Sequence, residues 1–491
     1  MRRCVCGLAV FVCGAAVMVI ELAGARVLAP FAGTSLYVWT SLVGVVLASL
    51  SVGYWWGGML ADRRPDARLL SLLLFMAAAS VGITAVAKDR ILILLQSRVD
   101  GPGALALCAS LALFAPANMV LGMVSPLAAR LTIRDTQSAG TTVGTLYALS
   151  ALGSITGTFL AGFVLIPFFG CARLLLLTSA ALGALSLAIA GGRRACARVA
   201  VLLALLAVGR AVPGGGRAGA VLDVDTPYNR VWVYRDSHEE TGRPILSLST
   251  DPYGQESAIY LDGNDLVFDY MKFFRLIERF APGFRSALMI GGGAYAYPGE
   301  FLRRYPDARI DVVEIDPMLT DISRNYFNLR DDPRLAVVHE DGRTFLNRGG
   351  AGYDVIIVDA FRDANCLPFH LATVEAVRRM RARLTAGGAV LVNIIGAIEG
   401  ADGRFTRAEY ATYAEVFPRV LLFPVDDPGD GRAAQNIILA ALDSPRDPAA
   451  GGSDEEMDRF LRHLWTGGVT ADVPVLTDDR SPVEYYLRRV R

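Results

Sequence analysis

The sequence SALMIGGG at residues 286–293 places an apolar strand directly before a glycine triplet. The triplet consists of Gly291, Gly292 and Gly293. A helical segment follows, and then a second apolar strand, 310–315, carries Glu314 near its end. Glycine lets the backbone approach a ligand closely, and a carboxylate at the end of the next strand can accept both hydroxyls of a ribose. This order predicts a doubly wound sheet that binds a nucleoside.

Two further apolar strands, 335–339 and 354–358, lead to Asp341 and Asp359. The carboxyl ends of parallel strands meet at one edge of such a sheet, where ligands bind. Asp341 is placed to reach an adenine amino group, and Asp359 is placed to accept a proton from an attacking amine. Each acid alone is explained as well by a solvated strand end or a helix cap. Together with the glycine turn, the acids indicate a nucleoside site far more specifically than any one of these features alone.

The motif also limits the class of reaction that the domain is expected to catalyse. No Walker lysine pattern follows the glycines, which argues against phosphate transfer. Two nucleoside-facing acids without a pyrophosphate motif suit a donor that lacks phosphates, such as a sulfonium adenosyl compound. We therefore expect alkyl transfer from sulfonium to nitrogen. Cys366 and His370 follow Asp359 in a loop, and we interpret both as incidental.

Composition divides the chain into two halves. Hydrophobic residues make up 53% of its 491 residues, more than a soluble domain needs, and the excess lies before about residue 212. The 48 basic and 48 acidic residues balance, so no nucleic-acid partner is expected. Seven scattered cysteines predict free thiols, and four separated histidines argue against a metal site.

The first half, residues 1–212, contains six apolar runs long enough to cross a bilayer. They lie at 4–20, 33–61, 69–87, 101–129, 136–172 and 174–190. A seventh run, 199–212, is short and contains Arg210. With six spans and a cytoplasmic start at Arg2 and Arg3, we expect a multi-pass inner-membrane protein whose soluble domain is cytoplasmic. With seven spans, the soluble domain would instead lie outside the cytoplasm.

Small and polar residues mark helix contacts in this half. Gly53 and Gly57, like Gly153 and Gly157, have the spacing that permits close helix packing. Pro116 and Pro126 are expected to kink the fourth span. Glu21 and Arg26 lie in or beside the first span, where functional charges and interfacial charges are equally plausible.

The periodicity changes after a glycine-rich linker, 213–218. Alternating segments in 219–265 predict a small antiparallel β subdomain. The remainder, 266–491, is predicted to be a Rossmann-like domain of the class I methyltransferase type. The expected fold class is thus a multi-pass α-helical membrane domain, then the β subdomain, then the α/β domain.

Residues 219–491 resemble the spermidine synthase (polyamine aminopropyltransferase) family, and the whole chain resembles its membrane-fused bacterial branch. The matching motifs are TPYN (226–229), MIGGG (289–293), VEID (313–316), EDG (340–342) and YDVIIVD (353–359). The resemblance implies that Glu314 binds ribose, Asp341 binds adenine and Asp359 activates the amine. It also matches Tyr270 to the substrate-side tyrosine, and it implies decarboxylated S-adenosylmethionine or S-adenosylmethionine as co-substrate, with no permanently bound cofactor.

The chain departs from the family pattern in two places. The family's glycine loop continues with an acid that helps to hold the aminopropyl donor, whereas this chain has Ala294. The family's second acid lies three residues after the catalytic aspartate, whereas Asp363 lies four after Asp359. The nucleoside pocket is therefore better supported than the amine pocket.

Three functions remain open from the sequence. The first is a membrane-tethered aminopropyltransferase that acts on a small amine. The second is a methyltransferase that uses S-adenosylmethionine itself, a hypothesis prompted by Ala294. The third is a transporter or sensor with a nucleoside-binding regulatory domain, prompted by Glu21 and the loop at Asp62 and Arg63. A six-span bundle is half of a usual transporter, so transport would require a homodimer.

Overall fold

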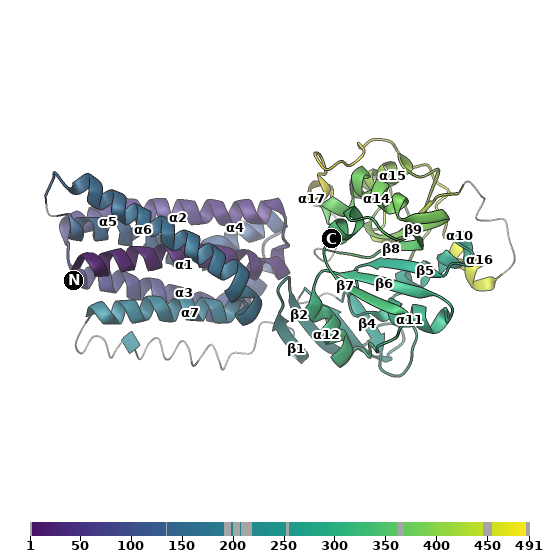
Figure 1. Cartoon of the computed structure of the whole chain (residues 1–491), viewed down its shortest axis with the longest axis horizontal. Helices are drawn as coiled ribbons and strands as arrows, with labels where there is room; N and C mark the ends of the chain where they lie inside the picture. Colours follow the sequence, from purple (N-terminus) through teal and green to yellow (C-terminus); the bar gives the residue numbers. More distant parts are fainter. Residues whose placement is uncertain are drawn as a thin grey trace. The chain divides into compact units, whose positions relative to one another are not determined.

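The computed structural model describes residues 2–133, 135–190, 198–199, 207, 219–251, 255–361, 368–444 and 454–487. The chain divides into two compact units, one mainly helical and one α/β (Figure 1). The helical unit comprises Met1–Arg217 with Asp223–Arg230, and the α/β unit comprises Ala218–Leu222 with Val231–Arg491. The linker expected at 213–218 lies outside the described residues, as does most of the apolar run 199–212.

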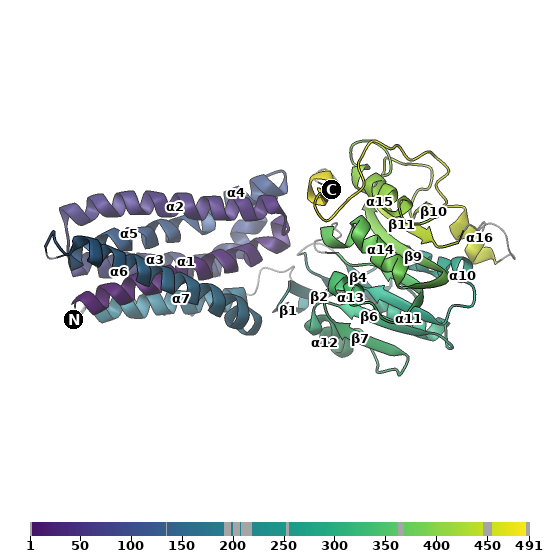
Figure 2. The ribbon, with the colours of Figure 1, turned by 45° about the horizontal axis from the view of Figure 1, so that its top comes forward.

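The helical unit is a bundle of long apolar helices packed side by side (Figure 2). Among the described residues, five helices are long and apolar enough to cross a membrane, and the count is six if the bent pair α4 and α5 is one span. The helices are α1 (Arg2–Ala32), α2 (Leu36–Arg63), α3 (Ala67–Gln96), α4 (Pro102–Leu113), α5 (Ala115–Thr132), α6 (Ala139–Leu160), the π-helical turn η1 (Ala161–Leu165) and α7 (Ile166–Ala190).

Glycines bring pairs of these helices into backbone contact, as predicted. A Cβ atom on Gly53 would collide with the carbonyl oxygen of Met119, so α2 and α5 can meet only with glycine there. A Cβ atom on Gly153 would collide in the same way with the carbonyl oxygen of Phe11 on α1. This close approach is the packing that small residues permit between membrane helices.

The sequence predicts kinks at two prolines, and the helices also depart from regular α-helical geometry elsewhere. The 52° bend between α4 and α5 lies beside Pro116, and that predicted kink is confirmed. Pro126 lies inside α5, which continues through it to Thr132, and the kink expected there stays a prediction. The uncharged run 136–172 contributes one candidate span, Ala139–Leu165, which combines α6 with the π-helical turn. Gly170 adopts φ 71° inside α7, near the start of the next candidate span.

The α/β unit contains two sheets. The small sheet has the order β1-β2-β3-β4, from β1 (Ala220–Asp225), β2 (Arg230–Ser237), β3 (Pro244–Ser249) and β4 (Ser257–Tyr260). The large sheet has the order β10-β11-β9-β8-β5-β6-β7. Its strands are β5 (Ser286–Ile290), β6 (Arg309–Glu314), β7 (Leu335–His339), β8 (Tyr353–Val358), β9 (Leu384–Gly396), β10 (Arg419–Pro424) and β11 (Gln435–Leu442).

Strands β5 to β9 of the large sheet are parallel, and β11 is antiparallel to both of its neighbours. This order and direction confirm the Rossmann-like fold of the class I methyltransferase type. Apolar side chains of β5 alternate between two cores, with Leu288 packed on one face of the sheet and Met289 on the other. Because both faces are buried, the strands are apolar throughout, which made them visible in the sequence.

Short helices cover both faces of the large sheet. They are α9 (Asp269–Phe273), η2 (Phe274–Leu276), α10 (Ile277–Phe280), α11 (Ala296–Arg304), α12 (Pro317–Tyr326), α13 (Gly342–Asn347), η3 (Phe369–Leu371), α14 (Val374–Ala382), α15 (Arg404–Ala414), α16 (Glu455–Leu461) and α17 (Val483–Tyr486). The sequence of residues 269–280 predicts a single helix, whereas the structure has α9, a 3-10 turn and α10 in succession.

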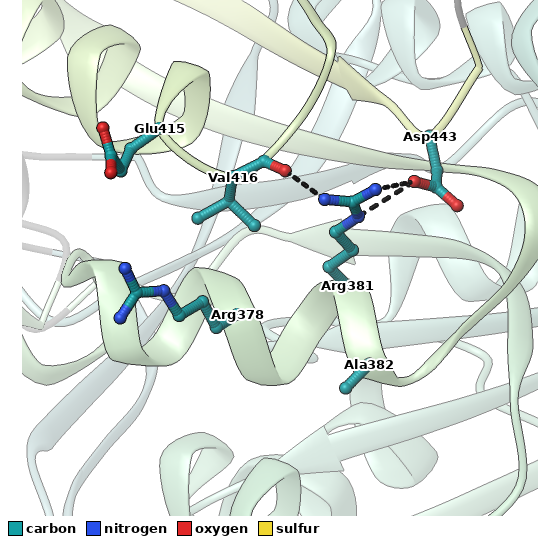
Figure 3. Close-up of a pocket in the computed structure, with 6 residues that line it drawn as sticks. All are labelled: Arg378, Arg381, Ala382, Glu415, Val416 and Asp443. Carbon is teal, nitrogen blue, oxygen red and sulfur yellow. Dashed lines mark hydrogen bonds and ion pairs between the residues drawn. The ribbon is translucent and has the colours of Figure 1, made fainter.

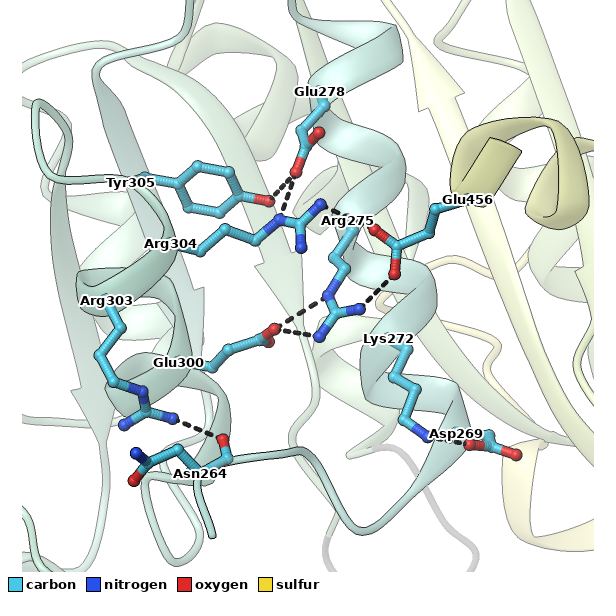
Figure 4. A network of polar contacts seen from close by, with 10 residues as sticks. All are labelled: Asn264, Asp269, Lys272, Arg275, Glu278, Glu300, Arg303, Arg304, Tyr305 and Glu456. Carbon is cyan, nitrogen blue, oxygen red and sulfur yellow. Dashed lines mark hydrogen bonds and ion pairs between the residues drawn. The ribbon is translucent and has the colours of Figure 1, made fainter. Parts of the chain in front are cut away.

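A network of charged side chains joins η2, α10, α11 and α16 (Figure 4). Arg275 donates to Glu300 of α11 and to Glu456 of α16. Arg304 bridges the same Glu456 to Glu278, with bonds of 2.7 Å to each. The side chains of Arg275 and Glu300 are only 14% and 10% exposed, so solvent screens their pairing weakly.

We expect Arg275→Met to destabilise the protein. It would leave the nearly buried Glu300 carboxylate unpaired, at a cost of about 3 kcal/mol. Chemical denaturation of the full chain, followed by fluorescence, would measure the change. Arg324→Met is the matched control, because Arg324 pairs only with exposed acids. Equal effects of the two substitutions would contradict this account.

Glu409 of α15 is fully buried, and neither carboxyl oxygen has a hydrogen-bond partner among the described residues. Burial therefore raises its pKa well above the usual value. A group that binds its proton more tightly in the folded state makes the free energy of unfolding fall as the pH rises from the pKa of the unfolded state to that of the folded state. The fall is at most about 1.4 kcal/mol per pH unit.

Glu409→Gln should therefore be more stable than wild type at pH 8, with the difference shrinking towards pH 4.5. Melting temperatures of the full chain across that range would show it. Exposed Glu415→Gln serves as the control and should leave the pH dependence unchanged. Parallel curves for wild type and Glu409→Gln would rule out this role for the carboxyl group.

Candidate active site

Four adjacent strands of the large sheet end in the residues singled out by sequence. In the order β8, β5, β6 and β7, the carboxyl ends carry Asp359, the glycine turn, Glu314 and Asp341. Backbone bonds hold these ends in register: Asp359 N–H donates to the Ile290 carbonyl at 2.9 Å, and Glu340 N–H donates to the Glu314 carbonyl at 3.2 Å. The sheet thus gathers the predicted residues along one edge.

The glycine turn can be built only from glycine at its first position. Gly291 adopts φ 97°, a conformation that residues with side chains rarely take. A Cβ atom there would also collide with the carbonyl oxygen of Asp359. The turn therefore lies directly against the end of β8, which brings the expected donor site and the expected catalytic acid together.

Glu314, at the end of the neighbouring strand β6, binds the backbone of the glycine turn. Its two carboxylate oxygens accept hydrogen bonds from Gly292 N–H at 2.8 Å and from Asp316 N–H at 2.9 Å. The side chain is 5% exposed, and burial raises its pKa. Each oxygen still has a lone pair free for a ligand hydroxyl, so the carboxylate could both hold the turn and accept from a ribose.

Asp341 has a partner that the sequence did not reveal. One oxygen caps α13 through Thr344 N–H at 2.9 Å, and the other lies 3.1 Å from Nε2 of His370. The bond from His370 and the capping bond lower the pKa of Asp341 to about 2 despite partial burial. Asp341 is therefore anionic at any physiological pH. The interpretation of His370 as incidental is wrong.

Asp359 is half-buried, and both of its carboxylate oxygens accept hydrogen bonds. Asn393 Nδ2 donates to Oδ1 at 3.0 Å, and the Tyr270 hydroxyl donates to Oδ2 at 3.2 Å. Burial raises the pKa of Asp359 to about 6, although both donors oppose the rise. A carboxylate with that pKa is ionised at pH 7 and can accept a proton readily, as a general base requires.

Of the two expected substrate residues, the structure describes one. Tyr270 contacts Asp359, whereas Asp363 lies outside the described residues. Asn393 was missed by sequence reasoning, although one amide within the buried strand AVLVNII already signals a polar partner. Ala294 is completely buried, and its N–H donates to Ser257 Oγ at 3.2 Å.

A surface cavity of about 440 Å³ lies elsewhere, beside α14 and α15 (Figure 3). It is lined by Arg378, Arg381, Ala382, Glu415, Val416 and Asp443. Arg381 already bonds to the Val416 carbonyl and to Asp443. Glu314, Asp341 and Asp359 are not among the residues that line this cavity. We therefore assign the chemistry to the carboxyl ends of the parallel strands.

Comparison with known proteins agrees with that assignment. Residues 277–392, which include the glycine turn and all three acids, match the model of the spermine/spermidine synthase domain. The α/β unit is a spermidine synthase-like domain. The chain is 27% identical to polyamine aminopropyltransferase 1 of Streptomyces coelicolor over 431 residues, which cover 78% of this chain and 74% of that protein.

Two other matches cover less of the protein. Putrescine N-methyltransferase 1 of Nicotiana tabacum is 37% identical over 108 residues, 20% of this chain and 29% of the relative. The crystal structure of a probable spermidine synthase from Corynebacterium glutamicum is 26% identical over 57% of this chain and 96% of that one, with a TM-score of 0.42. The chain spans 48%, 60% and 53% of the length of three other bacterial polyamine aminopropyltransferases.

Proposed function

We propose that the spermidine synthase-like domain transfers an aminopropyl group from decarboxylated S-adenosylmethionine to an amine. The observation that carries this proposal is the half-buried, ionisable Asp359, held by two donors beside the glycine turn. The match of residues 277–392 to the spermine/spermidine synthase domain supports it.

In the proposed reaction, the lone pair of the amine nitrogen attacks the aminopropyl carbon attached to sulfur. The new C–N bond forms as the C–S bond breaks, and the sulfonium leaves as a neutral thioether nucleoside. The proton lost by the amine passes to the Asp359 carboxylate. Glu314 and Asp341 would bind the ribose and the adenine, so that the reacting carbon lies next to Asp359.

We further propose that the helical unit anchors this domain in a lipid bilayer. Five long apolar helices, or six with the bent pair, support that placement. The bundle also exposes large apolar side chains, among them Trp55, Phe163 and Phe168, as a lipid-facing surface requires.

The assay uses the full chain in detergent with a panel of diamines and monoamines. Each amine is offered decarboxylated S-adenosylmethionine or S-adenosylmethionine, and products are read by mass spectrometry. We expect an aminopropylated amine and one thioether nucleoside per turnover. If neither donor is consumed with any amine, the proposed enzyme activity is wrong.

A methyltransferase is the second candidate. The buried Ala294 occupies the position where the family places an acid for the aminopropyl group, and the similarity to a putrescine N-methyltransferase adds to this reading. Calorimetry with the two donors distinguishes the candidates. Tighter binding of the decarboxylated donor, which carries no carboxylate, supports aminopropyl transfer, and tighter binding of S-adenosylmethionine supports methyl transfer.

A further inference from the structure

Behind Asp359 lies a second amide that continues its hydrogen-bond chain. Asn436 of β11 donates through Nδ2 to Asn393 Oδ1 at 3.0 Å, and Asn393 donates through Nδ2 to Asp359 at 3.0 Å. Asn393 is 1% exposed and lies in the middle of β9, surrounded by apolar side chains. A buried amide in such a place is costly unless its polar atoms are paired.

The chemistry of the three groups allows only one arrangement. An ionised carboxylate can only accept, so the Asn393 atom that faces Asp359 must be the NH₂ group. The carbonyl oxygen of Asn393 then faces Asn436, which must donate in turn. Asn436 thereby prevents the Asn393 amide from turning over and presenting its oxygen to the carboxylate.

We propose that Asn393 and Asn436 are positioning residues that hold the Asp359 carboxylate in one plane, with a lone pair turned towards the amine. Tyr270 occupies the other oxygen, so the carboxylate cannot rotate without breaking a bond on each side. This inference rests on the proposed transferase activity and explains how the Asp359 carboxylate keeps its orientation between turnovers.

The sharpest test is Asn436→Asp, because it changes no atom in contact with Asp359. Two carboxylates would then compete for the one NH₂ group of Asn393, and Asp359 would share or lose its donor. We expect kcat to fall about tenfold or more, with the acidic limb of the kcat/KM profile moved to higher pH and the donor KM nearly unchanged. Asn436→Leu is the matched control, since it removes a partner without competing and should cost much less.

Asn393→Leu removes the donor itself and should shift the acidic limb in the same direction. If the Asn436→Asp and Asn436→Leu profiles coincide, with both limbs at the wild-type pH, the positioning role is wrong. If the wild type transfers no group at all, the proposed function fails instead, so the two failures are distinct.

Discussion

Replacing Asp359 with asparagine should lower kcat by about 10²–10⁴-fold, the usual contribution of a general base. Donor affinity should change little, because the contacts of the turn and of Glu314 remain. The fold should also tolerate the change, since an amide oxygen can still accept from Asn393 and the amide nitrogen can donate to Tyr270. Steady-state kinetics with calorimetry on the full chain would separate the two effects.

The pH profile gives this prediction its second readout. With a pKa raised by burial to about 6, Asp359 loses its proton above that pH, so wild-type kcat/KM should fall about tenfold per pH unit below it. The residual activity of Asp359→Asn should lack that limb. Asp354→Asn, at the other end of β8, is the matched control. Wild-type behaviour of Asp359→Asn in every assay would favour a transporter or sensor over an enzyme.

Glu314→Gln should weaken donor binding by about 10–100-fold, corresponding to the roughly 1–3 kcal/mol lost when a buried donor has no acceptor. The glutamine nitrogen would face either Gly292 N–H or Asp316 N–H, and two donors cannot pair. The turn must then shift, and one acceptor for the ribose is lost. Isothermal titration of the full chain with each donor would measure the change.

A suitable control lies on the same strand. Asp311→Asn removes a charge from β6 at a site where, within the part of the chain that the structure describes, the carboxylate accepts from the Tyr353 hydroxyl, at 2.7 Å. It should leave donor affinity within about twofold. If Asp311→Asn and Glu314→Gln bind the donor equally well, the carboxylate of Glu314 does not act in donor binding.

The parallel strands of the large sheet were the most predictable part of the fold. β5 and β7 have the bounds expected from sequence, β8 begins one residue earlier, and β6 is shifted by one residue at both ends. Short apolar runs bounded by glycine, proline or acids leave little freedom where a strand is buried on both faces. The segment 269–280 was less predictable, because tertiary packing of Phe273 and Phe274 replaces a regular helix with tighter turns.

The candidate site was predictable where residues follow strands and hidden where partners come from distant segments. Asp341 and His370 are 29 positions apart, and their contact depends on the 3-10 turn η3. The chain from Asn436 to Asp359 spans three strands whose order no local pattern gives. The same holds for Arg26, whose partners lie 200 positions away.

The contact between Gly291 and the Asp359 carbonyl has a consequence for how this domain can change. Any side chain at 291 would push on the backbone that carries Asp359, so the proposed donor site cannot be altered there without displacing the proposed base. New specificity is easier to obtain where the two sites do not share backbone. Variation between related enzymes, and libraries designed to alter acceptor choice, should therefore be concentrated around Tyr270 and the loop after Asp359, with position 291 invariant.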